Sequence, residues 1–252
     1  MEAVLYICHG SRVKEASDQA ITFIKECMKE SNYPIQEYSF LELSEPSIEE
    51  GFKACVAKGA TTIYAVPVLL LTAAHAKVDI PEVLDELVKE FPAIQLHYGR
   101  PIGVHEKMAE IVAHKIKQSE SYKAKDALVL LVGRGSSDPD VKRDLREIGD
   151  MVESSLNGIK VEDCYLTAAS PSFEDALLAA NQSSYENIIV IPYLLFTGIL
   201  MNTMKKTINS LSNKEKKYEL CSYLGYHPSI SSILKDRIKE AAEADKYVPI
   251  NG

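Results

Sequence analysis

The sequence repeats itself at a spacing of 125 residues, and this duplication constrains the fold more than any other feature. The shared residues in the two halves keep one register, as with Gly10 and Gly135 or Pro67 and Pro192. A repeat of this length is a whole domain, because solenoid repeats have only about 20 to 50 residues. We therefore predict a tandem duplication of one domain. The matching segments are YICHGSR (6–12) with LVGRGSS (131–137), LELSEPSIEEGF (41–52) with LTAASPSFEDAL (166–177), and VPVLLLT (66–72) with IPYLLFT (191–197).

Short apolar runs alternate with longer amphipathic stretches in both halves. Within 47–58, for example, Ile48, Phe52 and Cys55 recur at helical spacing. Nearly continuous apolar strands that alternate with helices indicate an α/β fold with a parallel sheet covered on both faces. We place the domains at 1–118 and 126–252, joined by a polar linker at 119–125. The expected strands are 3–8, 35–41, 61–69, 94–98, 127–132, 160–166, 187–194 and 218–224, and the expected first-half helices are 12–30, 47–58, 78–91 and 104–118.

Composition excludes several classes of protein. The formal net charge is −8, from 28 basic and 36 acidic residues, which argues against a nucleic-acid partner. The longest apolar run, 65–71, is far shorter than the ~20 residues of a membrane helix, so we expect no membrane partner. Five cysteines without a CxxC spacing argue against a disulfide framework and a cysteine zinc site. With no signal-peptide pattern after Met1, we expect a cytoplasmic protein.

The two halves differ at reactive positions of the first half. Core residues persist in both halves because both must fold, whereas chemical residues need persist only where the chemistry occurs. His9, Glu42 and His75 follow three predicted strands, and the carboxyl ends of parallel strands share one edge of a sheet. We therefore expect these side chains to converge. The differing pairs are His9 and Arg134, Glu42 and Thr167, His75 and Leu200, and Asp79 and Met204.

Each of these residues also has a structural interpretation. His9 could belong to a turn in which Ser11 caps the next helix, although the second half keeps that turn without a histidine. His75 and Asp79 have the spacing of an ordinary surface pair on a helix, and Glu42 could be a solvated loop acid. Two imidazoles and a carboxylate suit either an open, exchangeable site for a divalent metal or proton transfer near neutral pH. The other four histidines, His97, His105, His114 and His227, are interpreted as structural.

The motifs around these residues resemble a known family. CHGSR (8–12), FLEL (40–43), VPVLLLTAAHAKVDIP (66–81) and GRPIGVH (99–105) are similar to motifs of the class II chelatases of the small cobaltochelatase type. The similarity covers essentially the whole chain. The tandem arrangement, with both histidines confined to the first half, resembles the long two-domain sirohydrochlorin ferrochelatases that make sirohaem.

The resemblance implies a fold and a site. Each half is expected to be a chelatase-like domain with a four-stranded parallel sheet flanked by helices. The first half is expected to carry the active site, and the second to form the other wall of the cleft. His9 and His75 are expected to bind the incoming metal, with His9 also removing pyrrole protons and Glu42 beside them. The loop expected to line the tetrapyrrole comprises Leu70, Leu71, Thr72, Ala73 and Ala74.

The expected activity is insertion of Fe²⁺ into sirohydrochlorin by a monomer, with the metal as a substrate and no tightly bound cofactor. Co²⁺ and Ni²⁺ are alternative metals, because relatives use similar ligands for them. Ser11 and Arg12 are expected to offset the negative charge of the substrate carboxylates. Three alternatives stay open: a sirohydrochlorin cobaltochelatase of the cobalamin pathway, a non-catalytic tetrapyrrole or metal carrier, and a metal-assisted hydrolase. A hydrolase would need a firmly held metal with three protein ligands.

Overall fold

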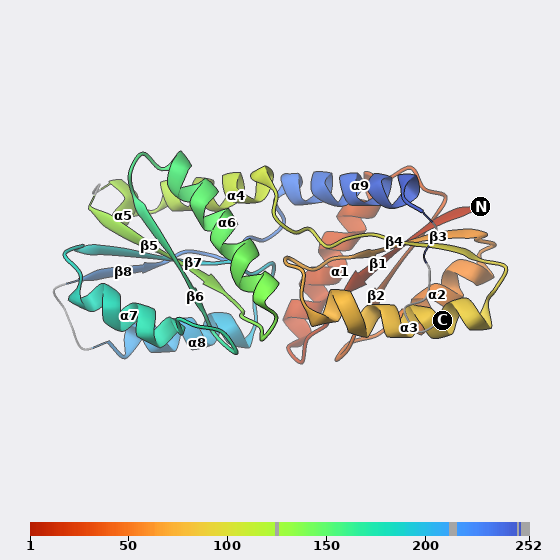
Figure 1. Cartoon of the computed structure of the whole chain (residues 1–252), viewed down its shortest axis with the longest axis horizontal. Coiled ribbons are helices and arrows are strands. Elements are labelled where there is room, and N and C mark those ends of the chain that lie inside the picture. Colours follow the sequence, from red (N-terminus) through yellow and green to blue (C-terminus); the bar gives the residue numbers. More distant parts are fainter. Residues whose placement is uncertain (124–125, 212–215, 246, 248–252) are drawn as a thin grey trace. The chain divides into compact units, whose positions relative to one another are not determined.

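The computed structural model describes residues 1–123, 126–211, 216–245 and 247, and it comprises two compact units (Figure 1). Unit 1 consists of Met1–Gly103 and the segment from Ile230 onward, and unit 2 is Val104–Ser229. Each unit contains one four-stranded parallel sheet between layers of helices, which confirms the predicted α/β class.

The sheet of unit 1 places its first strand in the interior. Its strands are β1 (Glu2–Cys8), β2 (Ile35–Phe40), β3 (Thr62–Pro67) and β4 (Gln95–Tyr98). The order is β2-β1-β3-β4, and every neighbouring pair is parallel. From Ala3 to Cys8, β1 is buried, because helices cover both faces of the sheet. The carboxyl ends of the strands therefore lie along one edge, where functional side chains can gather.

Helices cover the two faces of this sheet. They are α1 (Lys14–Lys29), α2 (Ile48–Ala57), the π-helical turn η1 (His75–Asp79), α3 (Ile80–Glu90) and α9 (Pro228–Glu243). Helices α2 and α3 pack in one core cluster with Leu5 and Ile7 of β1. Figure 1 shows α9 on the opposite side of the sheet from α2 and α3. There α9 meets the end of α1, where Lys235 forms an ion pair with Glu30 at 3.0 Å.

Unit 2 repeats this design. Its strands are β5 (Ala127–Gly133), β6 (Lys160–Tyr165), β7 (Asn187–Pro192) and β8 (Lys217–Leu220), in the order β6-β5-β7-β8. Its helices are α4 (Glu106–Gln118), α5 (Glu120–Lys123), α6 (Pro139–Ser155), α7 (Phe173–Gln182) and α8 (Ile199–Asn209). Helix α7 packs in one core cluster with Met204 of α8 and with Leu130 of β5. Helices α4 and α6 contact each other and bury their own apolar faces.

The last helices of the two repeats are exchanged between the units. Helix α4 ends the first repeat in the sequence but belongs to unit 2, while α9 from Ile230 onward belongs to unit 1. The compact units therefore do not follow the predicted boundaries of 1–118 and 126–252. Helices α4 and α9 bury apolar residues at equivalent positions, Met108 and Ile111 in α4 and Ile230 and Ile233 in α9, so local periodicity does not assign either helix to a sheet. Such an exchange of equivalent elements resembles domain swapping within one chain.

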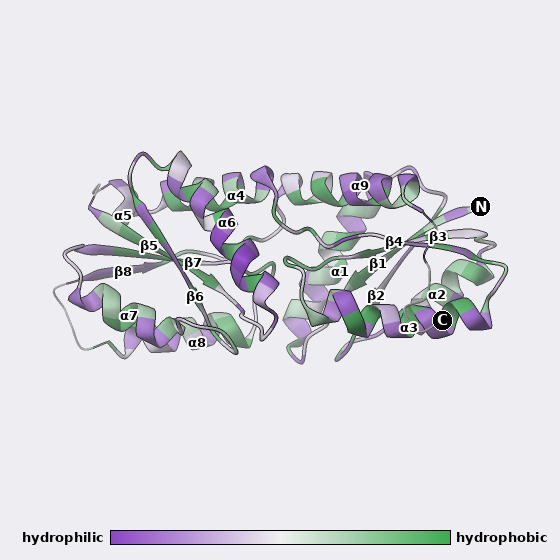
Figure 2. Cartoon of the chain, in the orientation of Figure 1, coloured by the Kyte–Doolittle hydropathy of each residue, from purple (hydrophilic) through white to green (hydrophobic). Residues whose placement is uncertain are grey.

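Most predicted elements are confirmed, and the predicted linker is partly wrong. The helix expected at 47–58 is α2, whose Ser47 and Glu50 form a capping box. Residues 120–123 of the expected linker form the short helix α5, while Ala124 and Lys125 lie outside the described residues. Figure 2 shows hydrophobic residues along the strands and hydrophilic stripes along the helices. Among helices of the described ranges, none combines the length and apolar character needed to cross a membrane.

Candidate active site

Backbone pairing beyond the ends of β1 and β2 brings His9 beside Glu42. The amide of Leu41 donates to the carbonyl of Cys8 at 2.8 Å, and the amide of Glu42 donates to the carbonyl of His9 at 3.1 Å. The parallel pairing thus continues past the regular strands. Both side chains therefore project from the carboxyl edge of the sheet, as the sequence predicts.

Gly10 makes this close approach possible. Its φ is +93°, and a Cβ at this position would lie 1.7 Å from the carbonyl oxygen of Glu42. An alanine would require the backbone to move, because backbone atoms fill the space and positive φ disfavours L-residues. Ser44 supports the same loop, since its Oγ accepts from the amide of Ser11 at 3.1 Å. The turn after β1 is thus shaped around the segment that carries Glu42.

His75 reaches the same edge from a π-helical turn. The turn η1 begins at His75, and α3 follows it directly. Isolated π turns of this kind occur frequently at functional sites. The hydroxyl of Tyr98, at the end of β4, donates to the carbonyl of Ala76 at 2.8 Å and so anchors the turn. Burial raises the pKa of Tyr98, which keeps this hydroxyl protonated as a donor.

The three predicted ligands come together. The Nε2 atoms of His9 and His75 are 3.1 Å apart, and Glu42 Oε1 is 3.6 Å from His9 Nε2. One ligand atom from each of the three residues falls within 4.8 Å of the other two. Two nitrogens bound at about 2.1 Å to one ion are separated by about 3.0 to 3.4 Å for bond angles near 90 to 110°. The spacing of the two imidazoles therefore matches that of two ligands to one metal ion.

The hydrogen bonds at the far side of each ring determine which nitrogen is free to bind. His75 Nδ1 donates to Asp79 Oδ2 at 2.5 Å, and His9 Nδ1 donates to the carbonyl of Gly10 at 3.1 Å. Each oxygen can only accept, so each Nδ1 carries a hydrogen, and in the neutral imidazole Nε2 then carries the lone pair. Two lone pairs therefore face each other next to a carboxylate. A divalent cation or a proton between them removes this repulsion.

The residues predicted to bind the substrate lie around this cluster. Ser11 is half-buried, and its Oγ accepts from the amide of Val13 at 3.0 Å, while Arg12 is exposed. Leu70, Leu71, Thr72 and Ala73 are half-buried and Ala74 is exposed in the loop that leads to His75. Contact of these residues with a tetrapyrrole stays a prediction.

Unit 2 keeps the backbone of the site without its chemistry. The amide of Thr167 donates to the carbonyl of Arg134 at 2.9 Å, which matches the bond between Glu42 and His9. Gly135 has a φ of +90°, and a Cβ there would lie 1.8 Å from the oxygen of Thr167. The turn therefore requires its glycine in both units and requires a histidine in neither. The histidine in unit 1 consequently serves something other than the turn.

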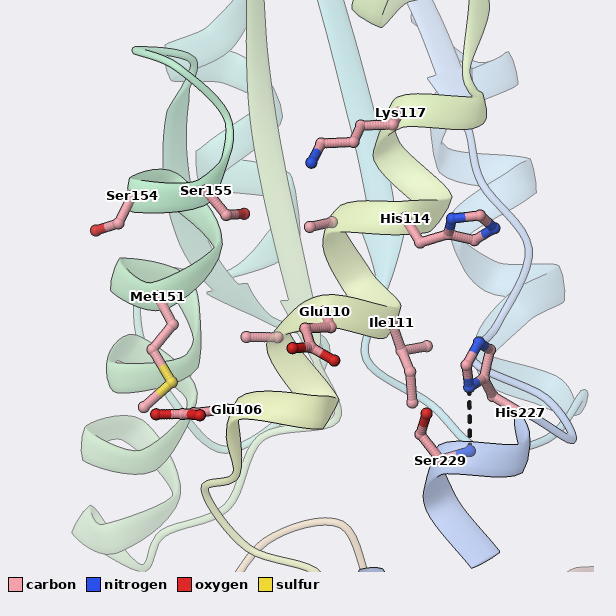
Figure 3. Close-up of a pocket in the computed structure, with 12 residues that line it drawn as sticks. Glu106, Glu110, Ile111, His114, Lys117, Met151, Ser154, Ser155, His227 and Ser229 are labelled. Carbon is pink, nitrogen blue, oxygen red and sulfur yellow. Dashed lines mark hydrogen bonds between the residues drawn. The ribbon is translucent and has the colours of Figure 1, made fainter. Parts of the chain in front are cut away.

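A groove of about 730 Å³ within unit 2 is not this site (Figure 3). His114 of α4 and His227, which precedes α9, both line this groove (Figure 3). His227 Nδ1 accepts from the amide of Ser229 at 3.3 Å, as His105 Nδ1 accepts from Lys107 at 3.1 Å. Burial, with the positive charges of His114 and Lys115, lowers the pKa of His227. Within the described ranges, the one cluster of three metal-ligating side chains is that of His9, Glu42 and His75.

The role of Asp79 was only partly visible in the sequence. Its spacing of four residues from His75 predicts that the two side chains lie close together on a helix. From the sequence alone, that pair is interpreted as an ordinary surface ion pair. The structure shows that the carboxylate selects the tautomer of His75, because it accepts from Nδ1. The absence of this acid from the second half was a usable signal, since Met204 replaces it together with the loss of both histidines.

Comparison with known proteins gives one family for both repeats. The CbiX family matches residues 3–119 and again residues 128–241. The sirohydrochlorin ferrochelatase of Priestia megaterium is 50% identical over 239 residues, which cover 95% of this chain and 90% of that protein.

Two solved structures are similar over nearly their whole length. SirB from Bacillus subtilis with Fe³⁺ has a TM-score of 0.86 at 42% identity, covering 96% of this chain and 95% of that one. The sirohydrochlorin chelatase SirB from Bacillus subtilis subspecies spizizenii, in complex with cobalt, has a TM-score of 0.83 at 41% identity, with the same coverage.

Proposed function

The chain belongs to the CbiX family, and on that basis we propose that it is a sirohydrochlorin ferrochelatase, which inserts Fe²⁺ into sirohydrochlorin to make sirohaem. The observation that carries the proposal is the pair of Nε2 lone pairs of His9 and His75, 3.1 Å apart beside Glu42. This arrangement holds a divalent ion through ligands of borderline softness. The similarity to ferrochelatases supports iron as the metal.

The site suits a metal that must be released. Imidazole and carboxylate ligands exchange more readily than thiolates, and Glu42 has a side chain that is 46% exposed. Fe²⁺ bound by His9, His75 and Glu42 is a substrate that leaves with the macrocycle. As the metal transfers, its bonds to the three protein ligands and to water are replaced by bonds to the ring nitrogens.

The same residues account for the protons. Insertion of a divalent metal removes two N–H protons from the tetrapyrrole. As the metal leaves Nε2 of His9, the freed lone pair accepts one of these protons, and Glu42, 3.6 Å away, stabilises the resulting imidazolium, while the second proton passes to solvent water. In His75 the carboxylate of Asp79 accepts from Nδ1, on the far side of the ring from the metal. This hydrogen bond makes Nε2 of His75 a stronger donor to the metal. We therefore assign the base to His9 and firmer metal binding to His75.

Substrate binding is assigned to the residues around the cluster. Arg12 is exposed and offers a guanidinium to the tetrapyrrole carboxylates, which the overall negative charge of the chain would otherwise repel. The loop from Leu70 to Ala74 lies directly before His75 and supplies the apolar contact with the ring. A monomeric state and the role expected of the second half stay predictions.

A cobaltochelatase is the second candidate, because a similar chelatase structure contains cobalt and the donor set suits either metal. A carrier would bind sirohydrochlorin without accelerating metallation. A hydrolase would retain its metal through dialysis, whereas a transfer site is expected to lose it.

The deciding experiment is an anaerobic absorbance assay of sirohydrochlorin with Fe²⁺ or Co²⁺, with and without protein. We expect His9→Ala and His75→Ala each to lower the rate of metallation at least ~100-fold. Arg134→Ala and Leu200→Ala, at the equivalent positions of the second half, are expected to retain most of the rate. Near-normal turnover by the His9→Ala variant would overturn the assignment.

A further inference from the structure

A buried arginine from the second repeat lies behind the loop that carries His75. Arg237 lies on α9, within unit 1, and is only 2% exposed. Its Nε donates to the carbonyl of Pro101 at 2.9 Å, and its Nη2 donates to the carbonyl of Ile102 at 2.5 Å. Its Nη1 donates to both carboxylate oxygens of Glu240, at 2.8 and 3.1 Å. The guanidinium therefore binds two successive carbonyls after β4.

The other side of the same two peptide groups binds the loop after β3. The amide of Ile102 donates to the carbonyl of Leu69 at 3.0 Å, and the amide of Gly103 donates to the carbonyl of Leu70 at 2.9 Å. The carbonyl of Pro101 and the amide of Ile102 belong to one peptide bond, as do the carbonyl of Ile102 and the amide of Gly103. Each peptide group thus joins Arg237 to the loop, and hydrogen bonds in such chains strengthen one another.

The equivalent place in unit 2 keeps the backbone bonds but not the arginine. There the amide of Leu224 donates to the carbonyl of Leu194 at 2.8 Å, and the amide of Gly225 donates to the carbonyl of Leu195 at 3.0 Å. The residue of α4 that corresponds to Arg237, at the repeat offset of 122, is Lys115. Its Nζ donates to the hydroxyl of Ser222 at 2.9 Å. The arginine clamp therefore occurs in the unit that contains the histidine cluster.

Packing alone does not explain a cation at this position. Burial lowers the pKa of Arg237, the charge of Arg100 lowers it further, and Glu240 opposes both. Desolvation of a charged group is unfavourable, and buried ion pairs can often be replaced by apolar side chains without loss of stability. An apolar residue would fill the volume, but it could not hold two carbonyls in position.

We propose that Arg237 is a positioning residue of the histidine site. Through the peptide groups of Pro101–Ile102 and Ile102–Gly103 it fixes the loop from Leu69 to Ala74, and this loop sets the distance between His75 and His9. The inference rests on the proposed metal site, although it does not depend on which tetrapyrrole is the substrate. It also gives the exchanged helix a function, because the second repeat supplies a support for the site of the first.

The test compares Arg237→Met with Lys115→Met, which removes the corresponding cation from unit 2. Binding of Co²⁺ without tetrapyrrole is measured by titration, together with the visible absorption of the bound ion, which reports its ligand geometry. Metallation of sirohydrochlorin gives kcat and KM, and thermal unfolding shows how far each variant is destabilised. A His75→Ala variant confirms that the Co²⁺ signal arises from the histidine site.

We expect Arg237→Met to weaken Co²⁺ binding about tenfold, change the absorption of the bound ion and lower kcat about 10- to 100-fold. Lys115→Met should change each quantity less than about threefold at a similar loss of Tm. Unchanged Co²⁺ affinity and absorption in a folded Arg237→Met protein would overturn the proposal, as would equal losses in both variants. Arg237→Lys keeps the charge but loses the planar guanidinium that donates to two carbonyls at once, and it provides a second variant if Arg237→Met does not fold. Wild-type Co²⁺ binding and kcat in folded Arg237→Lys would also contradict the proposal.

The outcome separates this inference from the proposed function. Should the wild-type protein bind Co²⁺ through His75 but fail to metallate sirohydrochlorin, the function is wrong while the Co²⁺ comparison still decides the role of Arg237. Should His75→Ala bind Co²⁺ normally, the metal site itself is wrong, and the positioning role falls with it.

Discussion

Replacement of Asp79 by asparagine tests how the site selects the ligand nitrogen of His75. The change keeps the shape of the side chain but removes the charge that accepts from Nδ1 at 2.5 Å. An asparagine amide can also donate to Nδ1, which would move the hydrogen to Nε2 and block the ligand atom. Both effects weaken metal binding without removing either histidine.

The expected magnitude follows from the exposure of the pair. A hydrogen bond to a charged group contributes about 1.5 to 3 kcal/mol, and loss of a partner of a metal-bound histidine lowers affinity or activity about 10- to 100-fold. The side chains of His75 and Asp79 are 33% and 43% exposed, so solvent screens part of the interaction. We therefore expect a loss at the lower end of this range, about tenfold in Co²⁺ affinity, which corresponds to about 1.4 kcal/mol.

The assay is a titration with Co²⁺ at fixed pH and ionic strength, together with the rate of metallation. Glu82→Gln is the matched control, because Glu82 is an exposed acid in the first turn of α3 and the change removes one negative charge. An affinity of Asp79→Asn within twofold of wild type would refute the reasoning. An equal loss in Glu82→Gln would show that net charge, and not the tautomer of His75, controls metal binding.

Two further predictions concern stability. Gly10→Ala is expected to destabilise the protein by more than about 3 kcal/mol in urea unfolding, since its Cβ would lie 1.7 Å from the carbonyl oxygen of Glu42. Gly158 has a φ of +91° and open space around it, so Gly158→Ala should lower the free energy of unfolding by only about 1 to 2 kcal/mol. Similar losses of stability in the two variants would contradict the steric argument. Arg100 first, and then Arg237, lower the pKa of Glu240, while burial opposes them. The ionised carboxylate of Glu240 therefore stabilises the folded protein above its unfolded pKa of about 4.3. This stabilisation is lost as the pH falls through the lower pKa of the folded state. The Tm difference between wild type and Glu240→Gln should therefore be constant from pH 7 to about 5 and shrink below about 4, whereas a difference that grows at low pH would reverse the sign.

The sequence by itself determined the repeat, the strands and the composition of the site. Strand and helix periods are local patterns, and duplication lets each half serve as a reference for the other. The convergence of His9, Glu42 and His75 was also predictable, because the carboxyl ends of parallel strands meet at one edge. Local periodicity and topology are sufficient for all of these inferences.

Only the tertiary structure decided which helix covers which sheet and what supports the site. Helices α4 and α9 carry similar apolar faces, so periodicity cannot assign either of them to a sheet. Arg237 contacts Pro101 across 136 positions of the chain, and neither local periodicity nor the repeat predicts that contact. The tautomer of His75 likewise depends on the direction in which Asp79 points from the π-helical turn. The identities of the reactive residues are written in the local sequence, whereas their orientation depends on contacts that form only when distant segments pack together.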